Sequence, residues 1–181
     1  DDMINDGRAD MIVSNYSVTE DRRERVAFCT PVAVIDEYLV LPKDREGDRL
    51  ADLGEITVAV PEDTAYAETA AELAERHDTV TVETLPSGTS DSGLLDAVAE
   101  GGYDAAIVDG NMLDSLLMDY DGLRKGPVVT ERRRIAWAVR PDNPVLRAAI
   151  NEFIISHHVS ASVQTRAQRD WAAIKEEGVL R

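Results

Sequence analysis

The sequence predicts an α/β protein built as two lobes, and three observations support this fold class. Short apolar runs of strand type alternate with helical segments in the order βαβαβ, which is typical of a largely parallel sheet with helical crossovers. A glycine turn, an Asp and an apolar strand follow one another twice, near residues 7–13 and 101–107. The chain has 181 residues, which is enough for two small lobes with cores of their own.

The first part of the chain is expected to form short elements. Residues 1–5 are typical of the end of a helix, which Gly7 closes as a left-handed C-cap. Residues 9–13 form an apolar run of buried-strand type. Thr19 is expected to cap a helix that carries acidic residues in its first turn. A second extended stretch is expected over residues 27–41.

The remaining expected elements follow from periodicity and from helix start signals. Ser90 or Asp91 is expected to cap the second long helix, which ends near Gly101. The expected elements are strand 56–60, helix 65–76, strand 79–84, the helix after Ser90, strand 105–108, strand 135–139 after Gly126–Pro127, and helices near 143–157 and 160–177.

Composition disfavours several classes of partner. The 35 Asp and Glu residues outnumber the 19 Lys and Arg residues, so the formal charge is −16. This charge disfavours binding to nucleic acid or to an anionic membrane, because phosphate contacts need clustered Lys and Arg. No stretch approaches the roughly 20 apolar residues that span a bilayer. Cys29 is the single cysteine, and without a Cys pair or a His/Cys cluster we expect no metal and no cofactor.

The internal repeat also indicates where a ligand would bind. A polar residue follows the Asp of each copy by five positions, Asn15 in the first copy and Asp109 in the second. In open α/β sheets, ligands bind beyond the carboxyl ends of the strands. Two similar lobes that face each other would therefore form one binding cleft.

Several motifs together resemble one known family. The run GRADMIVSNYSVTEDR at residues 7–22, followed by VAFCTP at 26–31, resembles the signature of family 3 extracellular solute-binding proteins. Asp52-Leu53-Gly54 before a Val-Ala-Val strand, YDAAIVD at 103–109 and AWAVRPDNP at 136–144 agree with it. Residues 132–144 look most like the solute-binding module of membrane-bound lytic murein transglycosylase F.

The resemblance implies a type 2 periplasmic binding fold with two α/β lobes and a cleft between them. Residues 1–44 would form part of lobe one, 45–128 would form lobe two, and 129–181 would return to lobe one and add the C-terminal helices. Family members also carry a leading βαβ portion, so lobe one is expected to be incomplete. Its open sheet edge would favour self-association.

The resemblance assigns ligand contacts to five residues near the start of the chain. Arg22 matches the position that grips a ligand α-carboxylate, a role that suits its planar fork of donors; a solvated surface arginine is the alternative. Ser14, Asn15 and Ser17 match contacts around that carboxylate, with turn stabilisation as the alternative. Tyr16 would line the cleft as an aromatic platform or pack in the core.

Two further ligand contacts are assigned to lobe two. Asp109 matches the position that accepts a hydrogen bond from the ligand α-ammonium, and a helix N-cap is its alternative role. Thr64 begins a helix whose N-terminus could hold an anion, or it serves as an N-cap alone. We expect no catalytic residue among these seven.

The resemblance implies a periplasmic or extracytoplasmic binding module for an amino acid or a small peptide, muropeptides included. A transporter permease or a covalently linked catalytic domain would respond to the bound state. Two alternatives remain open: an enzyme on the same scaffold, such as a cyclohexadienyl dehydratase, and the sensing domain of a membrane kinase.

Overall fold

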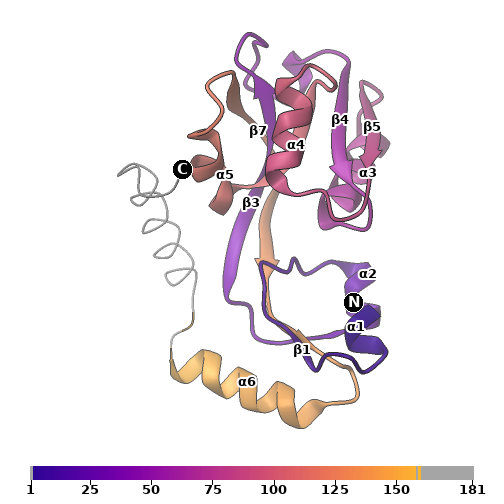
Figure 1. Cartoon of the computed structure of the whole chain (residues 1–181), viewed down its shortest axis with the longest axis vertical. Coiled ribbons are helices and arrows are strands. Elements are labelled where there is room, and N and C mark those ends of the chain that lie inside the picture. The colour runs from indigo at the N-terminus through magenta and orange to yellow at the C-terminus, as the bar shows by residue number, and fades with distance from the viewer. Residues whose placement is uncertain (1, 158, 160–181) are drawn as a thin grey trace. The chain divides into compact units, whose positions relative to one another are not determined.

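The computed structural model describes residues 2–157 and 159, and the chain divides into two compact units. The described part of unit 1 comprises residues 2–35, 132–157 and 159, and unit 2 is Asp36–Glu131. The chain enters unit 2 within strand β3 and leaves it within strand β7 (Figure 1). The helix expected near 160–177 lies outside the described residues.

Unit 2 is an α/β layer structure. Its elements, including the two strands shared with unit 1, are β3 (Ala33–Pro42), the 3-10 helix η1 (Leu50–Asp52), β4 (Ile56–Pro61), α3 (Ala65–Arg76), β5 (Val80–Leu85), α4 (Asp91–Ala99), β6 (Ala105–Asp109), α5 (Gly110–Leu117) and β7 (Leu123–Ile135). The strand order is β5-β4-β6-β3-β7, with β4 parallel to β5 and to β6 and with β3 antiparallel to β6. The predicted βαβαβ order is confirmed, and its three strands β4, β5 and β6 are parallel, whereas β3 makes the sheet as a whole mixed.

The central strands of unit 2 are buried on both faces. In β4, Val58 and Val60 belong to the core cluster that includes α3, whereas Ala59 belongs to the cluster that includes α4 and α5. Residues of β3 and β6 alternate between the same two clusters. Because successive side chains point to opposite faces of a strand, α3 covers one face of the sheet and α4 and α5 cover the other.

Two features of unit 2 differ from the sequence-based expectation. Strand β7 begins at Leu123 and runs through Gly126–Pro127 instead of starting beyond them. Proline is tolerated there because β7 is an edge strand of the sheet. Helix α5 directly follows β6 and was foreseen only through the alternative role of Asp109 as an N-cap. Its eight residues begin at Gly110, a residue type that weakens a helix signal.

Unit 1 contains a small antiparallel sheet. Besides the parts of β3 and β7 that it shares with unit 2, unit 1 contains α1 (Asp2–Asn5), β1 (Met11–Ile12), α2 (Glu20–Arg25), β2 (Ala27–Phe28), β8 (Ala138–Val139) and α6 (Pro144–Ser156). Strand β8 lies between β1 and β2. Helix α6 buries Ile150 and Ile154 in the cluster that contains Val139. None of the described helices is long and apolar enough to cross a membrane.

The Asp of each internal repeat pairs with an arginine. The Asp104 carboxylate accepts hydrogen bonds from the Thr57 backbone N–H at 2.8 Å and from the Arg45 guanidinium at 2.5 Å. Asp10 lies 3.6 Å from Arg140. Arg45 also donates to the carbonyl oxygens of Leu53 and Glu55. Through these hydrogen bonds, Asp104 connects the start of β6 with the start of β4 and with the loop before β4.

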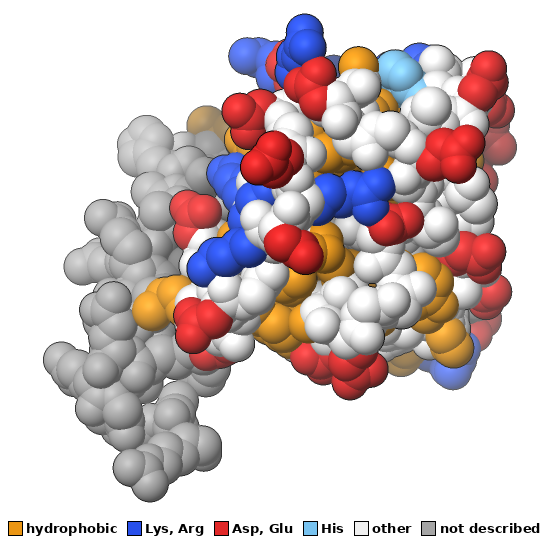
Figure 2. Space-filling view, turned by 90° about the horizontal axis from the view of Figure 1, so that it is seen from above, with side chains coloured by type: hydrophobic (Ala, Val, Ile, Leu, Met, Phe, Trp, Pro, Cys, Tyr) orange, Lys and Arg blue, Asp and Glu red, His pale blue; other side chains and the backbone are white. Residues whose placement is uncertain are grey.

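Charge is distributed unevenly along the chain. Unit 2 carries 23 acidic residues against six basic ones, whereas the rest of the sequence carries 12 acidic and 13 basic residues. The face shown in Figure 2 bears many acidic side chains with a smaller number of Lys and Arg side chains among them. Folding unit 2 therefore brings many like charges close together, which opposes compaction.

Replacing Asp104 with alanine is expected to lower the free energy of unfolding by about 1–2 kcal/mol, because two donors lose their acceptor and the carboxylate is partly exposed. Urea denaturation measures the change. Asp78→Ala is the control, since Asp78 is exposed in the turn before β5. Equal stability losses in the two variants would contradict this role of Asp104.

Added salt is expected to stabilise the protein. Raising NaCl from about 0.1 M to about 1 M shortens the Debye length from roughly 10 Å to roughly 3 Å, so repulsion among the carboxylates of unit 2 weakens. The urea midpoint of unfolding should rise across this series. A midpoint that falls with salt would indicate that attractive ion pairs dominate.

Candidate functional site

The loop that carries four of the predicted residues is held by backbone hydrogen bonds within unit 1. The Ala136 N–H donates to the Tyr16 carbonyl oxygen at 3.0 Å, and the Val18 N–H donates to that of Arg134 at 2.8 Å. Ser17 lies between these bonds, opposite Ile135, as in an antiparallel pair. The backbone of this loop is therefore held against the end of β7.

Arg22 is brought together with Tyr16 and Ser17. Its Nη1 donates to the Ser17 carbonyl oxygen at 3.1 Å, and its guanidinium carbon lies 4.3 Å from the centre of the Tyr16 ring. The predicted cap of α2 is confirmed, since the Thr19 hydroxyl accepts from the Arg22 N–H. Because a guanidinium has five N–H donors, a half-buried Arg22 held in this way can still offer a planar edge to a carboxylate.

The four predicted residues of the loop differ in exposure. Ser17 is buried, Asn15 and Tyr16 are half-buried, and Ser14 is exposed. The Tyr16 ring contacts the Phe28 ring, with centroids 5.5 Å apart, and packs against a buried cluster that includes Val26. Tyr16 therefore packs against the core, as its alternative role predicted, and also contacts Arg22.

In unit 2, Thr64 forms the N-cap of α3. Its hydroxyl donates to the Pro61 carbonyl oxygen at 2.7 Å and accepts from the Ala67 N–H at 3.3 Å. The capping role is thus confirmed, and the single hydroxyl proton of Thr64 is already used. Asp63, just before it, has a φ of 60°, a conformation that favours glycine.

Asp109 is the last residue of β6 and is only 3% exposed. It lies directly opposite Glu37 of β3 in the antiparallel register, and Glu37 is fully buried. The Thr69 hydroxyl of α3 donates to Glu37 at 2.6 Å. Because directly opposed residues share a face of the sheet, both carboxylates lie on the face that α3 covers.

The position of Asp109 is that of an N-cap, as its alternative role required, but its side chain makes no capping hydrogen bond to α5. The next residue, Gly110, packs closely against β3: a Cβ there would lie 2.7 Å from the Tyr38 ring. The carboxylate of Asp109 is thus held at a crowded strand end, at the N-terminus of α5.

The hydroxyl of Tyr66, in the first turn of α3, accepts a hydrogen bond from the Asp109 N–H at 3.3 Å. Burial raises the pKa of Tyr66, and the nearby carboxylates of Asp109, Asp91 and Glu37 raise it further. Burial also raises the pKa of Asp91, while a hydrogen bond with Tyr66 acts in the opposite direction. These neighbours make the carboxyl ends of β4, β5 and β6 a polar, strongly acidic region.

Sequence reasoning missed Glu37, Tyr66 and Asp91 as neighbours of Asp109. For Glu37 the sequence does contain an indication, because a carboxylate inside the mostly apolar run from Ala33 to Leu41 must be either exposed to solvent or hydrogen-bonded. Tyr66 and Asp91 left none, since each is ordinary in the first turn of a helix.

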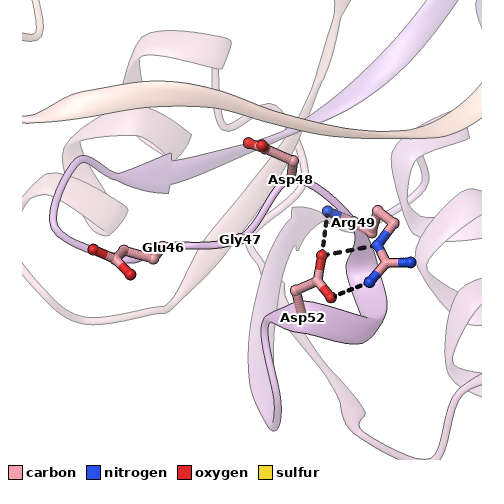
Figure 3. A pocket seen from close by; sticks show the side chains of 5 residues that line it. All are labelled: Glu46, Gly47, Asp48, Arg49 and Asp52. Atoms are coloured by element: carbon pink, nitrogen blue, oxygen red, sulfur yellow. Dashed lines mark hydrogen bonds and ion pairs between the residues drawn. The ribbon is translucent and has the colours of Figure 1, made fainter.

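A separate surface hollow is lined by residues of the loop before η1 and by one residue of η1 (Figure 3). Its residues are Glu46, Gly47, Asp48, Arg49 and Asp52. The Arg49 guanidinium donates to Asp52 at 3.0 and 2.7 Å, and this pairing lowers the pKa of Asp52. None of the predicted site residues lines this hollow. Among the described residues, no His, Cys, Asp and Glu side chains gather in a way that could hold a metal ion.

The family comparison covers nearly the whole chain. Residues 2–172 match the family described as bacterial extracellular solute-binding proteins, family 3. This match includes the loop of Arg22 and the strand end at Asp109.

Curated relatives include two membrane-bound lytic murein transglycosylases F. The one from Desulfosudis oleivorans is 28% identical over 149 residues, which are 81% of this chain and 32% of the relative. The one from Methylobacillus flagellatus is 26% identical over 133 residues, 72% of this chain and 28% of the relative. The chain thus spans about a third of the length of these relatives.

Solved structures share the fold. Holo ArgBP from T. maritima matches with a TM-score of 0.73 and 23% identity, covering 87% of this chain and 67% of that protein. The cysteine-binding protein from Campylobacter jejuni matches with a TM-score of 0.76 and 21% identity, covering 94% of this chain and 66% of that protein. The predicted type 2 periplasmic binding fold is confirmed.

Replacing Thr64 with alanine is expected to lower the free energy of unfolding by about 1 kcal/mol, because α3 loses its side-chain cap. Thermal or urea unfolding measures the loss. Thr64→Ser keeps the hydroxyl and serves as the control, with stability close to that of the wild type. If the alanine variant were as stable as the serine variant, the cap would contribute nothing.

Proposed function

Because this chain belongs to family 3 of the bacterial extracellular solute-binding proteins, we propose that it binds an amino acid or a small peptide through residues of both units. The observation that carries the proposal is Arg22, whose guanidinium is held by Ser17 and Tyr16. A planar fork fixed in this way binds a carboxylate through two charge-assisted hydrogen bonds.

Each unit supplies one end of the recognition of a zwitterion. Arg22 of unit 1 binds the α-carboxylate, with Ser14, Asn15 and Ser17 as polar contacts and Tyr16 as an aromatic wall. Asp109 of unit 2 binds the α-ammonium, which its buried position at a strand end favours. The backbone N–H groups in the first turn of α3, which Thr64 caps, contribute the positive end of the helix dipole to the site. Binding makes and breaks no covalent bond.

The two groups of similar proteins suggest two different partners that would respond to the ligand-bound form, and each partner defines one output. The transglycosylase relatives favour a regulatory module that senses a muropeptide for a linked catalytic domain. Solved neighbours include an amino acid ABC transporter substrate-binding protein bound to L-arginine, which favours delivery to a permease. Both outputs place the protein outside the cytoplasm. Self-association is also part of the proposal, because β1 and β2 are the outer strands of the sheet in unit 1.

Isothermal titration against a panel of amino acids and muropeptide fragments tests the ligand site. At least one member should bind saturably, and Arg22→Ala should weaken it about 100-fold or more because a charged hydrogen-bonding pair is lost. Arg22→Lys should weaken it about tenfold, since a lysine keeps the charge without the fork.

The matched control is Arg23→Ala, because Arg23 is the exposed neighbour in the same helix and pairs with Glu20 at 3.8 Å. This variant should bind like the wild type. Equal losses in Arg22→Ala and Arg23→Ala would contradict the carboxylate role of Arg22. Turnover of any panel member would instead support an enzyme on this scaffold.

A further inference from the structure

Two acidic side chains lie opposite each other where β6 ends. Asp109 is the last residue of β6 and pairs in the antiparallel register with Glu37 of β3. Glu37 is fully buried, and Asp109 is 3% exposed. Directly opposed residues on one face of a sheet have Cβ atoms about 4.5–5.5 Å apart. The two carboxylates therefore belong to one small region that water barely reaches.

Helix α3 contacts both members of this pair. The Thr69 hydroxyl donates to Glu37 at 2.6 Å, and the Tyr66 hydroxyl accepts from the Asp109 N–H at 3.3 Å. Tyr66 and Thr69 are three residues apart in α3, so they lie on the same side of the helix. One side of α3 thus covers the pair and is hydrogen-bonded to both of its residues.

An acidic residue at position 37 opposes folding. Like charges placed directly opposite each other on a sheet are destabilising, and a buried carboxylate also loses its hydration. An amide of the same shape would still accept a hydrogen bond from Thr69 without adding a charge. Stability alone therefore does not account for Glu37, and departures of this kind from stable packing are expected at functional sites.

We propose that Glu37 is a specificity-determining residue, which makes the ligand site select amino acids with a cationic side chain. The inference rests on the proposed function and names its class of ligand. In that function Arg22 binds the α-carboxylate and Asp109 binds the α-ammonium, so a zwitterion leaves the charge of Glu37 unbalanced. A ligand with one further positive charge restores the balance.

Glu37 acts through its electric field and not through a contact with the ligand. Near a buried region the effective dielectric constant is well below that of water, so a carboxylate attracts a cation several ångströms away. The rest of unit 2 adds to this preference, because it carries 23 acidic residues against six basic ones. A neutral ligand side chain gains nothing from this field, and an acidic one is repelled.

Isothermal titration with L-arginine and L-citrulline tests the inference, because the two side chains have nearly the same shape and differ in charge. The wild-type protein should bind L-arginine at least about tenfold more tightly. Glu37→Gln keeps an acceptor for Thr69 and removes the charge. In this variant the ratio of the two Kd values should fall to about threefold or less, mainly because L-arginine binds more weakly.

Glu83→Gln is the matched control, because Glu83 is exposed on β5 of the same sheet. It removes the same charge from unit 2 and should keep the wild-type ratio. Thr69→Val breaks the hydrogen bond to Glu37 but leaves the carboxylate, so it should also keep the preference for L-arginine. Equal falls of the ratio in Glu37→Gln and Thr69→Val would overturn the inference, since packing and not charge would then set the preference.

The wild-type protein can overturn the inference without any variant. Binding of a panel member with no preference for L-arginine over L-citrulline would overturn this inference and leave the proposed function standing. An unchanged preference in Glu37→Gln would do the same. A wild-type protein that binds no panel member would overturn the proposed function and this inference with it.

Discussion

Burial of β3, β4 and β6 on both faces is the constraint on which the rest of unit 2 depends. Side chains of these strands pack against α3 on one face and against α4 and α5 on the other. A polar group placed in such a layer must find a partner, because an unpaired buried group costs a large part of the protein's marginal stability. Glu37 meets this requirement through Thr69 of α3. The packing of α3 is therefore tied to a carboxylate as well as to apolar contacts.

The two units position their candidate residues by different means. In unit 1, backbone hydrogen bonds hold residues 16–18 against the end of β7, and the Arg22 guanidinium then rests on a carbonyl oxygen and an aromatic ring. In unit 2, Asp109 is placed by strand register and by the end of a buried strand. The first arrangement presents a cation, Arg22, and the second an anion, Asp109.

Much of the fold could be predicted because its signals are local. The helix expected at 65–76 has those bounds in the structure, and Thr19, Thr64 and Ser90 cap helices as their residue types indicate. Gly7 has the positive φ expected of a C-cap. The predicted start of the strand after Gly126–Pro127 was wrong, because β7 already includes these residues. Proline is excluded from central strands but tolerated in an edge strand, which β7 is. Edge position is a property of the whole sheet and cannot be read from the residues of one strand.

The sequence by itself predicted most of the element order, the helix caps and the family, and it supplied the candidate residues of the proposed ligand site. Tertiary structure alone decided that Glu37 lies opposite Asp109, that the Tyr66 hydroxyl accepts a hydrogen bond from the Asp109 N–H, and that the Arg22 guanidinium lies over the Tyr16 ring. The physical reason is that alternation along a strand reveals which side chains are buried, but not which strand lies opposite or in which register. Partners that belong to separate helices and strands meet only after the layers have packed.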